Sequence, residues 1–239
     1  MIPHKIQYCW FGRNPKPEKV LKCIESWKKF CPGWEITEWN EDNYDVNKSK
    51  FSSDAYKDKK WAFVADYARF DILNQLGGVY LDTDVELLKP IPDYLMTEEA
   101  FTGFEMADRV NPGLVYGTVP GQQCLKEALE YYDNAEFTTD KTVVDVTTEI
   151  LVRHGLKQDN SEQTVIGVKT MPTEYFGCYN HEIQVYEPTE NTISLHHYHA
   201  SWVPKRRIYK YKIIKYVAKI LGKERYLRIK RFLLKGRRG

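Results

Sequence analysis

Two aspartates separated by one residue form the pattern in this sequence that most directly suggests chemistry. Asp82 and Asp84 occur in the run YLDTD, which follows the apolar residues of a predicted strand. Because side chains alternate along a strand, both carboxylates would point to one side, with their Cα atoms about 6.6 Å apart. At that spacing they could share one divalent cation such as Mg²⁺ or Mn²⁺. A solvated strand end is the structural alternative for so short a motif.

A second acid and a base lie upstream of this pair. Asp66 and Arg69 are three residues apart in the apolar run WAFVADYARFDIL, so they share one face of a predicted helix. The alternative is a weak surface ion pair. The run is too apolar to be solvated on all sides, and a buried charge needs a partner or a ligand. Arg69 offers a planar fork for phosphate or hydroxyl groups, and Asp66 can accept hydrogen bonds from hydroxyls.

A third group of polar residues lies near position 200, in the run LHHYHASW. His196, His197 and His199 could supply a metal ligand next to the hydroxyl of Ser201 and the indole of Trp202. Ordinary surface and core histidines are the alternative. The sequence alone leaves both interpretations open.

Alternating strands and helices are predicted to position these three groups. Strands are predicted at 6–11, 34–39, 79–88, 101–105 and 114–118, with shorter ones at 165–169, 183–186 and 193–197. Helices are predicted at 17–30, 61–76, 125–132 and 143–154, with at least one short helix in the polar stretch 40–60. This alternation predicts an α/β domain with a mostly parallel central sheet, in which ligands bind at the carboxyl ends of the strands.

Charge divides the chain of 239 residues into two parts, although the formal net charge is only +2. Residues 205–239 contain 15 Lys and Arg and a single acid, Glu224, which leaves a net charge of −12 on residues 1–204. The hydrophobic content of 42% is enough for one core. We therefore divide the chain into one domain, residues 1–204, and a basic tail, residues 205–239.

Apolar runs and cysteines indicate where such a chain would act. No apolar run approaches 18 residues, so no membrane-spanning helix is predicted, and the N-terminal residues lack the apolar region of a signal peptide. The five cysteines are odd in number and form no C-x-x-C pair. These features predict free thiols and a cytoplasmic protein.

Three segments, taken in order, resemble one known family. They are IQYCWFG near the start, ADYARFDILNQLGGVYLDTDVELLKP in the middle, and HHYHASW at the end of the domain. Together they resemble the DXD-containing sugar transferases of glycosyltransferase family 32, which include bacterial capsular and surface polysaccharide transferases and are distantly related to the large glucosylating bacterial toxins. The resemblance covers about residues 1–204. It implies a Rossmann-like GT-A fold, a nucleotide-sugar donor (a UDP-sugar is favoured), a Mn²⁺ or Mg²⁺ ion, and transfer with retention of anomeric configuration.

The resemblance also implies roles for individual residues. Asp82 and Asp84 would bind the ribose and the metal, with Asp84 the more direct ligand. His197 is favoured over His196 and His199 as the third metal ligand. The implied catalytic residues are Asp66, Arg69 and Asp84, and the implied donor-binding residues are Tyr8, Cys9, Trp10, Asp66, Arg69, Tyr80, Asp82, Asp84, Ser201 and Trp202. The chain departs from the family pattern after Tyr132, so Asn111 and Asp145 are only open candidates on the acceptor side.

The tail has an amphipathic pattern of its own. Basic residues recur every three or four positions from Lys212 to Lys223, and apolar residues fill the opposite side. Such helices commonly lie on anionic membrane surfaces, so we expect peripheral association with the inner face of a membrane and a lipid-linked saccharide acceptor. The alternatives are a helix packed on the acidic domain and nucleic-acid binding, and we expect no nucleic-acid partner.

Two other functions remain open from the sequence. The run LDTDV fits the nucleophile motif of haloacid dehalogenase-type phosphatases, in which Asp82 would attack phosphate and Asp84 would act as acid and base. That class needs the motif near the start of its domain and a later strand that ends in an acidic pair, and neither is evident. A non-catalytic membrane-surface module would explain the tail but not the four charged residues around the D-x-D motif.

Overall fold

The computed structural model describes most of the domain and short pieces of the tail. Its described residues are 1–198, 214, 216–217, 219–222 and 225–230. The predictions for His199, Ser201 and Trp202, and those for most of the tail, lie outside these residues. Among the described residues, no helix has both the length and the apolar content needed to cross a bilayer.

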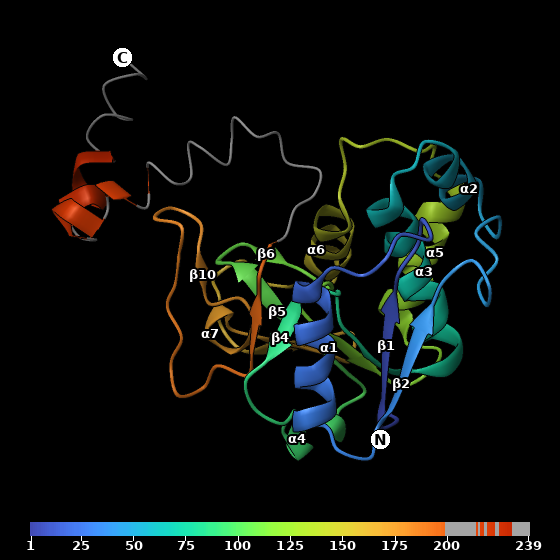
Figure 1. Ribbon diagram of the computed structural model, residues 1–239, viewed down its shortest axis with the longest axis horizontal. Helices are drawn as coiled ribbons and strands as arrows, with labels where there is room; N and C mark the ends of the chain where they lie inside the picture. The colour runs from blue at the N-terminus through green and yellow to red at the C-terminus, as the bar shows by residue number, and fades with distance from the viewer. Residues whose placement is uncertain (199–213, 215, 218, 223–224, 231–239) are drawn as a thin grey trace.

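A single large sheet forms the centre of the domain (Figure 1). Its strands lie in the order β2-β1-β3-β7-β5-β9-β8, with the short β6 paired to β5. β2, β1, β3, β5 and β9 run in one direction, and β7 and β8 run in the other. The bounds are β1 Lys5–Cys9, β2 Glu35–Trp39, β3 Gly78–Tyr80, β5 Ala100–Met106, β6 Arg109–Val110, β7 Tyr116–Thr118, β8 Gln163–Val165 and β9 Val168–Met171. The prediction of an α/β domain with a mostly parallel sheet is therefore confirmed.

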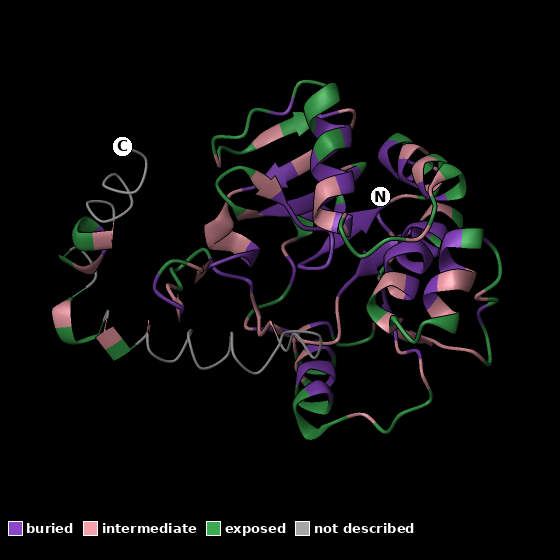
Figure 2. Ribbon diagram, turned by 90° about the horizontal axis from the view of Figure 1, so that it is seen from above, coloured by how far each residue is buried: buried purple, intermediate pink, exposed green. Residues whose placement is uncertain are grey.

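Helices cover both faces of this sheet. They are α1 Glu18–Phe30, α2 Lys50–Lys57, α3 Trp61–Leu76, α4 Asp93–Met96, α5 Gln123–Asn134, α6 Val143–Arg153 and α7 Thr173–Phe176. Neighbouring strand residues divide between two cores, because Tyr80 packs with α3, α5 and α6 whereas Val79 and Leu81 pack with α1, α4 and α7. Figure 2 shows the buried residues along the strands and the exposed residues on the outer faces of the helices.

The helix α3 begins and ends where the sequence predicts, at Trp61 and Leu76. It is buried over most of its circumference, and every residue from Asp66 to Leu73 is buried. Gly77 follows the helix with a φ of 64°, a conformation that glycine adopts without a steric penalty. The chain therefore turns at once into β3, the interior strand that leads to the two aspartates.

The predicted strand 79–88 is wrong in one respect that matters for the site. It is two strands, β3 and β4 (Val85–Leu87), and Asp82 and Asp84 lie in the connection between them. β3 belongs to the large sheet, whereas β4 leaves it and pairs with β12 (Ser194–His196). The two carboxylates are therefore not brought together by strand alternation. The predicted strand 165–169 is likewise a hairpin, β8–β9, because Gly167 with a φ of 78° turns the chain.

Several carboxyl ends meet at one edge of the sheet. β1, β3 and β5 run in the same direction, so Trp10, Asp82 and Glu105 lie at or near corresponding ends of their strands. The antiparallel β7 starts at this edge, directly after the turn that contains Gly113. This is the position where open α/β sheets bind ligands.

Candidate active site

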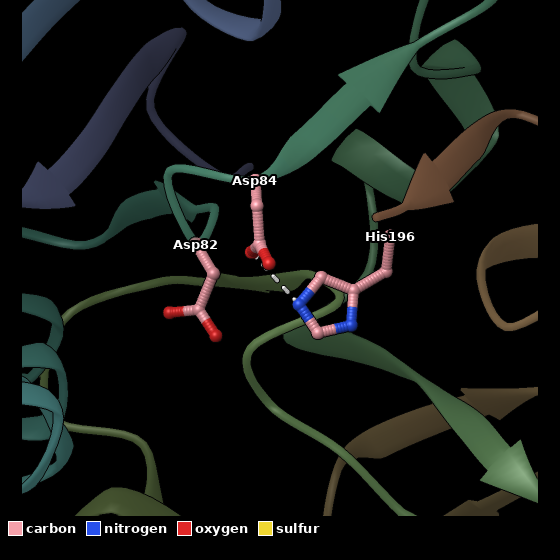
Figure 3. A group of neighbouring side chains, drawn as sticks. All are labelled: Asp82, Asp84 and His196. Carbon is pink, nitrogen blue, oxygen red and sulfur yellow. Dashed lines mark ion pairs between the residues drawn. The ribbon is translucent and has the colours of Figure 1, made fainter. Parts of the chain in front are cut away.

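Three potential metal ligands come together at this edge of the sheet. The ligand atoms of Asp82, Asp84 and His196 all lie within 4.8 Å of one another. His196 Nε2 is 2.9 Å from Asp84 Oδ1, as drawn in Figure 3. Two carboxylates and one imidazole form a donor set that suits Mn²⁺, and the carboxylates also suit Mg²⁺. The residues present therefore fit the divalent cation that the sequence resemblance implies.

Backbone contacts hold the connection that carries the two aspartates. The amide of Asp82 donates to the carbonyl of Gly113 at 3.1 Å, and the amide of Val85 donates back to the carbonyl of Asp82 at 3.0 Å. A Cβ on residue 113 would lie 2.1 Å from Asp82 Oδ2. Only glycine at that position lets the Asp82 carboxylate occupy this space.

The antiparallel ladder of β4 and β12 brings the histidine to the aspartates. It pairs His196 with Val85, the residue directly after Asp84, so the ring of His196 reaches the Asp84 carboxylate. The next residue, His197, has its Nε2 2.8 Å from Glu86 Oε2. The alternating ladder therefore directs His196 to the two aspartates and His197, the ligand expected from the sequence, to Glu86.

Arg69 links the helix α3 to Asp82, Asp84 and His196, the three candidate ligands that we call the metal group. Its Nη2 lies 3.0 Å from Asp66 Oδ1 and 3.1 Å from Asp82 Oδ1, and its Cζ lies 4.8 Å from the centre of the Tyr80 ring. The Arg69 side chain is only 3% exposed and Asp66 is 7% exposed. The expectation that these charges are buried is met. Arg69 Nη1 is also buried and has no hydrogen-bond partner among the described residues, so it can donate to a ligand.

Burial opposes charge on the carboxylates of this cluster. It raises the pKa of Asp66 to about 7, against the opposing effect of Arg69. Burial also raises the pKa of Asp82, although Arg69 and His196 act in the other direction. Burial lowers the pKa of His196, but the nearby Asp84 and Asp82 outweigh it and leave that pKa raised. A bound cation would relieve the repulsion between such close carboxylates.

The first strand supplies fewer free side chains than its sequence suggests. Tyr8 is buried and its hydroxyl donates to Glu38 Oε2 at 2.7 Å. Cys9 is buried as well, and burial raises the pKa of its thiol to about 12. Trp10 is only half-buried, with its indole N–H donating to the carbonyl of Asn14 at 2.7 Å. Of the three, Trp10 is the least buried, and Lys16 Nζ lies 5.9 Å from the centre of its ring.

The two acceptor-side candidates have different surroundings. Asp145 forms the capping box of α6 with Thr142 and pairs with Arg109, which makes its role structural. Asn111 is buried beside the metal group, where its Oδ1 accepts from the amide of Gly113 at 2.7 Å. The Asn-Pro-Gly turn was visible in the sequence, but its position opposite Asp82 depends on the antiparallel strand β7.

A protein-family model matches the part of the chain that contains most of these site residues. Residues 17–102 match the model of the glycosyltransferase sugar-binding region containing the DXD motif, and this range includes Asp66, Arg69, Asp82 and Asp84. The chain is 25% identical over 222 residues to an uncharacterized glycosyltransferase, L373, of Acanthamoeba polyphaga mimivirus, with 88% of this chain and 87% of the viral protein covered.

Two further similarities are more distant or more local. The chain is 31% identical over 111 residues to inositol phosphoceramide mannosyltransferase 1 of Schizosaccharomyces pombe, which covers 42% of this chain and 33% of the yeast protein. Among solved structures, a glycosyltransferase involved in the glycosylation of the major capsid of PBCV-1 aligns with a TM-score of 0.48 and 12% identity, over 88% of this chain and 98% of that one.

Proposed function

We propose that this chain, which contains the DXD region of glycosyltransferases, is a metal-dependent, retaining glycosyltransferase that moves a sugar from a nucleotide-sugar to a saccharide acceptor. One observation carries this proposal: the Asp82, Asp84 and His196 group lies directly beside the buried Arg69 and Asp66. A UDP-sugar is the favoured donor and Mn²⁺ the favoured ion.

The residues of the site contact the two groups that separate during transfer, the diphosphate and the sugar. Asp82, Asp84 and His196 would hold a divalent cation, which when bound supplies a Lewis acid for the diphosphate leaving group. Arg69 Nη1 would donate to a phosphate or sugar oxygen, with its position fixed beforehand by the two carboxylates that bind Nη2. Asp66 would accept hydrogen bonds from sugar hydroxyls and favour positive charge on the sugar ring.

Retention is proposed to follow from attack on the face that the leaving group occupies. The acceptor hydroxyl approaches the anomeric carbon from that face, and an oxygen of the departing diphosphate takes its proton. The scheme assigns none of the described carboxylates as a covalent nucleophile, because Asp82 and Asp84 are assigned to the cation and Asp66 to the sugar hydroxyls.

The donor proposal is tested by ligand stabilisation of the folded protein. A true donor with Mn²⁺ should raise the melting temperature, because a ligand at 100 times its Kd adds about 2.7 kcal/mol to the free energy of unfolding. We expect a UDP-sugar with Mn²⁺ to give the largest shift in a panel of UDP- and GDP-sugars, and slow release of UDP to accompany it. Equal shifts with Mn²⁺ alone would contradict donor binding.

The acceptor is proposed to be a lipid-linked saccharide of surface polysaccharide synthesis. A chain that binds a membrane surface through its tail would meet such an acceptor there. The name of the yeast relative describes a transferase that acts on a lipid, which agrees with this proposal. Two described tail residues leave apolar side chains in solvent, since Tyr216 is 67% and Ile220 is 64% exposed. A later part of the tail contacts the domain, where Leu227 packs on Ile183 and Lys230 pairs with Glu182. Together with the charge of the tail, the two exposed side chains support peripheral binding to an anionic bilayer at the cytoplasmic face.

The tail proposal predicts a loss of membrane binding in a full-length variant. Replacing Tyr216 and Ile220 by Ser removes exposed apolar surface and should lower co-sedimentation with anionic phosphatidylserine vesicles at least several-fold. Leu21→Ser is the matched control, because Leu21 is also exposed but lies on α1, far along the chain from the tail. Unchanged binding by the double variant would contradict the role of these side chains.

A further inference from the structure

A short piece of the tail is docked on the domain. Leu227 is only 7% exposed and packs on the buried Ile183. Lys230 Nζ lies 3.1 Å from Oε1 of Glu182, the residue next to Ile183. Both tail residues belong to one helical piece, residues 225–230 (Figure 1). An apolar contact and an ion pair therefore attach this piece to a single segment of the domain.

The segment that the tail contacts is a hairpin with little support of its own. It consists of β10 (Tyr179–Asn180) and β11 (Val185–Tyr186), which pair antiparallel over only two residues each. The connection between them, residues 181–184, carries both Glu182 and Ile183. An isolated two-stranded hairpin is marginally stable at best in water. Because the tail covers Ile183, its docking should stabilise the hairpin.

The same hairpin contacts the strand that carries His196. The amide of His197 donates to the carbonyl of Asp84 at 2.9 Å, so the backbone groups of His196 point to the edge of β12 that faces away from β4. At that edge the hydroxyl of Tyr186 donates to the carbonyl of His196 at 3.0 Å. The centre of the Tyr186 ring also lies 6.0 Å from that of His197. One side chain of β11 therefore supplies a hydrogen bond that β12 does not receive from β4.

Other rings of the hairpin pack in the same place. The ring centre of Tyr198 lies 4.2 Å from that of His196, 5.1 Å from that of Tyr179 and 4.9 Å from that of His181. Close-packed side chains of this kind transmit a displacement from one to the next. A movement of the hairpin would therefore disturb His196 through this ring cluster as well as through its carbonyl.

We propose that residues 225–230 of the tail dock on the β10–β11 hairpin and thereby hold Tyr186 against His196, so that binding of the cation depends on the tail. This inference rests on the metal-dependent function proposed above. Tyr186 acts as a positioning residue, because it fixes the backbone from which the ring of His196 extends to the two aspartates. Contacts that orient a metal ligand in this way contribute to the affinity of the site for its ion.

Binding of Mn²⁺ tests the link at Tyr186 without turnover. It can be followed in the full chain, with no donor present, by electron paramagnetic resonance of the free ion. Tyr186→Phe keeps the ring and removes the hydroxyl, and it should weaken Mn²⁺ binding about three- to tenfold, the range for the loss of one hydrogen bond. Tyr179→Phe is the matched control, because the Tyr179 hydroxyl donates to Gln184 within the hairpin at 2.9 Å. It should change the affinity less than about twofold.

Leu227→Ser tests the contribution of the tail. The change removes the apolar contact with Ile183 and should weaken Mn²⁺ binding at least about twofold. It should also speed hydrogen exchange of the amide of Gln184, which donates to the carbonyl of Asn180 in the hairpin, even without metal. Ile229→Ser is the control, because Ile229 is exposed in the same piece of the tail. Neither quantity should change in that variant.

The outcomes separate this proposal from the function on which it rests. Thermal unfolding without metal should show that all four variants are folded. Wild-type Mn²⁺ affinity in Tyr186→Phe or in Leu227→Ser would overturn the proposal, and so would an equal loss in either control. A wild-type protein that binds no Mn²⁺ would instead refute the metal-dependent function, and this proposal with it.

Discussion

Asp84→Asn should lower metal-dependent release of UDP from a UDP-sugar by about 10³-fold. Asp84 is one of two carboxylates in the metal group, and it also binds His196 Nε2 at 2.9 Å. A cation that stabilises charge on the leaving group supplies several kcal/mol, and each 1.4 kcal/mol is a factor of ten in rate. An amide retains the size of the side chain but not the charge that attracts the ion. The measurement is UDP release at saturating donor with added Mn²⁺.

Asp42→Asn is the appropriate comparison for this loss. Asp42 is also an aspartate in a connection, but its side chain is exposed and pairs only with the exposed Arg13 in the described contacts. Its variant should retain wild-type turnover. If Asp84→Asn turns over at nearly the wild-type rate in the presence of EDTA, the proposed mechanism is wrong.

Arg69→Met should destabilise the protein by about 3–5 kcal/mol and also remove activity. The guanidinium is almost completely buried and lies between Asp66 and Asp82. Removing one partner of a buried ion pair leaves the other charges buried and uncompensated, which accounts for a cost of this size. Urea unfolding of the metal-free protein measures the change in the free energy of unfolding.

Two further variants test whether the loss of stability in Arg69→Met comes from buried charges that have lost their partner. Arg13→Met breaks an exposed arginine–aspartate pair and should leave the free energy of unfolding almost unchanged. Asp66→Asn combined with Arg69→Met removes one of the stranded carboxylates and should regain part of the lost stability, which a double-mutant cycle would reveal. Equal losses in Arg69→Met and Arg13→Met would show that burial of the charge has little effect on stability.

Local sequence patterns predicted the scaffold of the site well. The apolar run that gives α3 its bounds also required Asp66 and Arg69 to be buried, because no exposed face remained for them. The same run ends at the Gly77–Gly78 pair, which fixes where the chain enters the sheet. These are short-range properties, set by the periodicity of side chains and by the conformational freedom of glycine.

Properties set by distant parts of the chain were not predictable in the same way. The aspartates lie in a connection because β4 pairs with β12, more than 100 residues later, and not with the large sheet. Whether His196 or His197 faces the aspartates depends on the register of that pairing, since a shift by one residue exchanges the two sides of a strand.

The ladder between β4 and β12 also has a consequence for how the protein is made on the ribosome. The last of the three side chains proposed to bind the cation belongs to β12, so this group stays incomplete until that strand has been synthesised and has paired with β4. Translation proceeds at about 5–20 residues per second, so Asp84 exists for on the order of ten seconds before His196 is added. The nascent chain can fold its first strands and α3 in that interval without a complete cation site, and competence for binding arises only near the end of the domain.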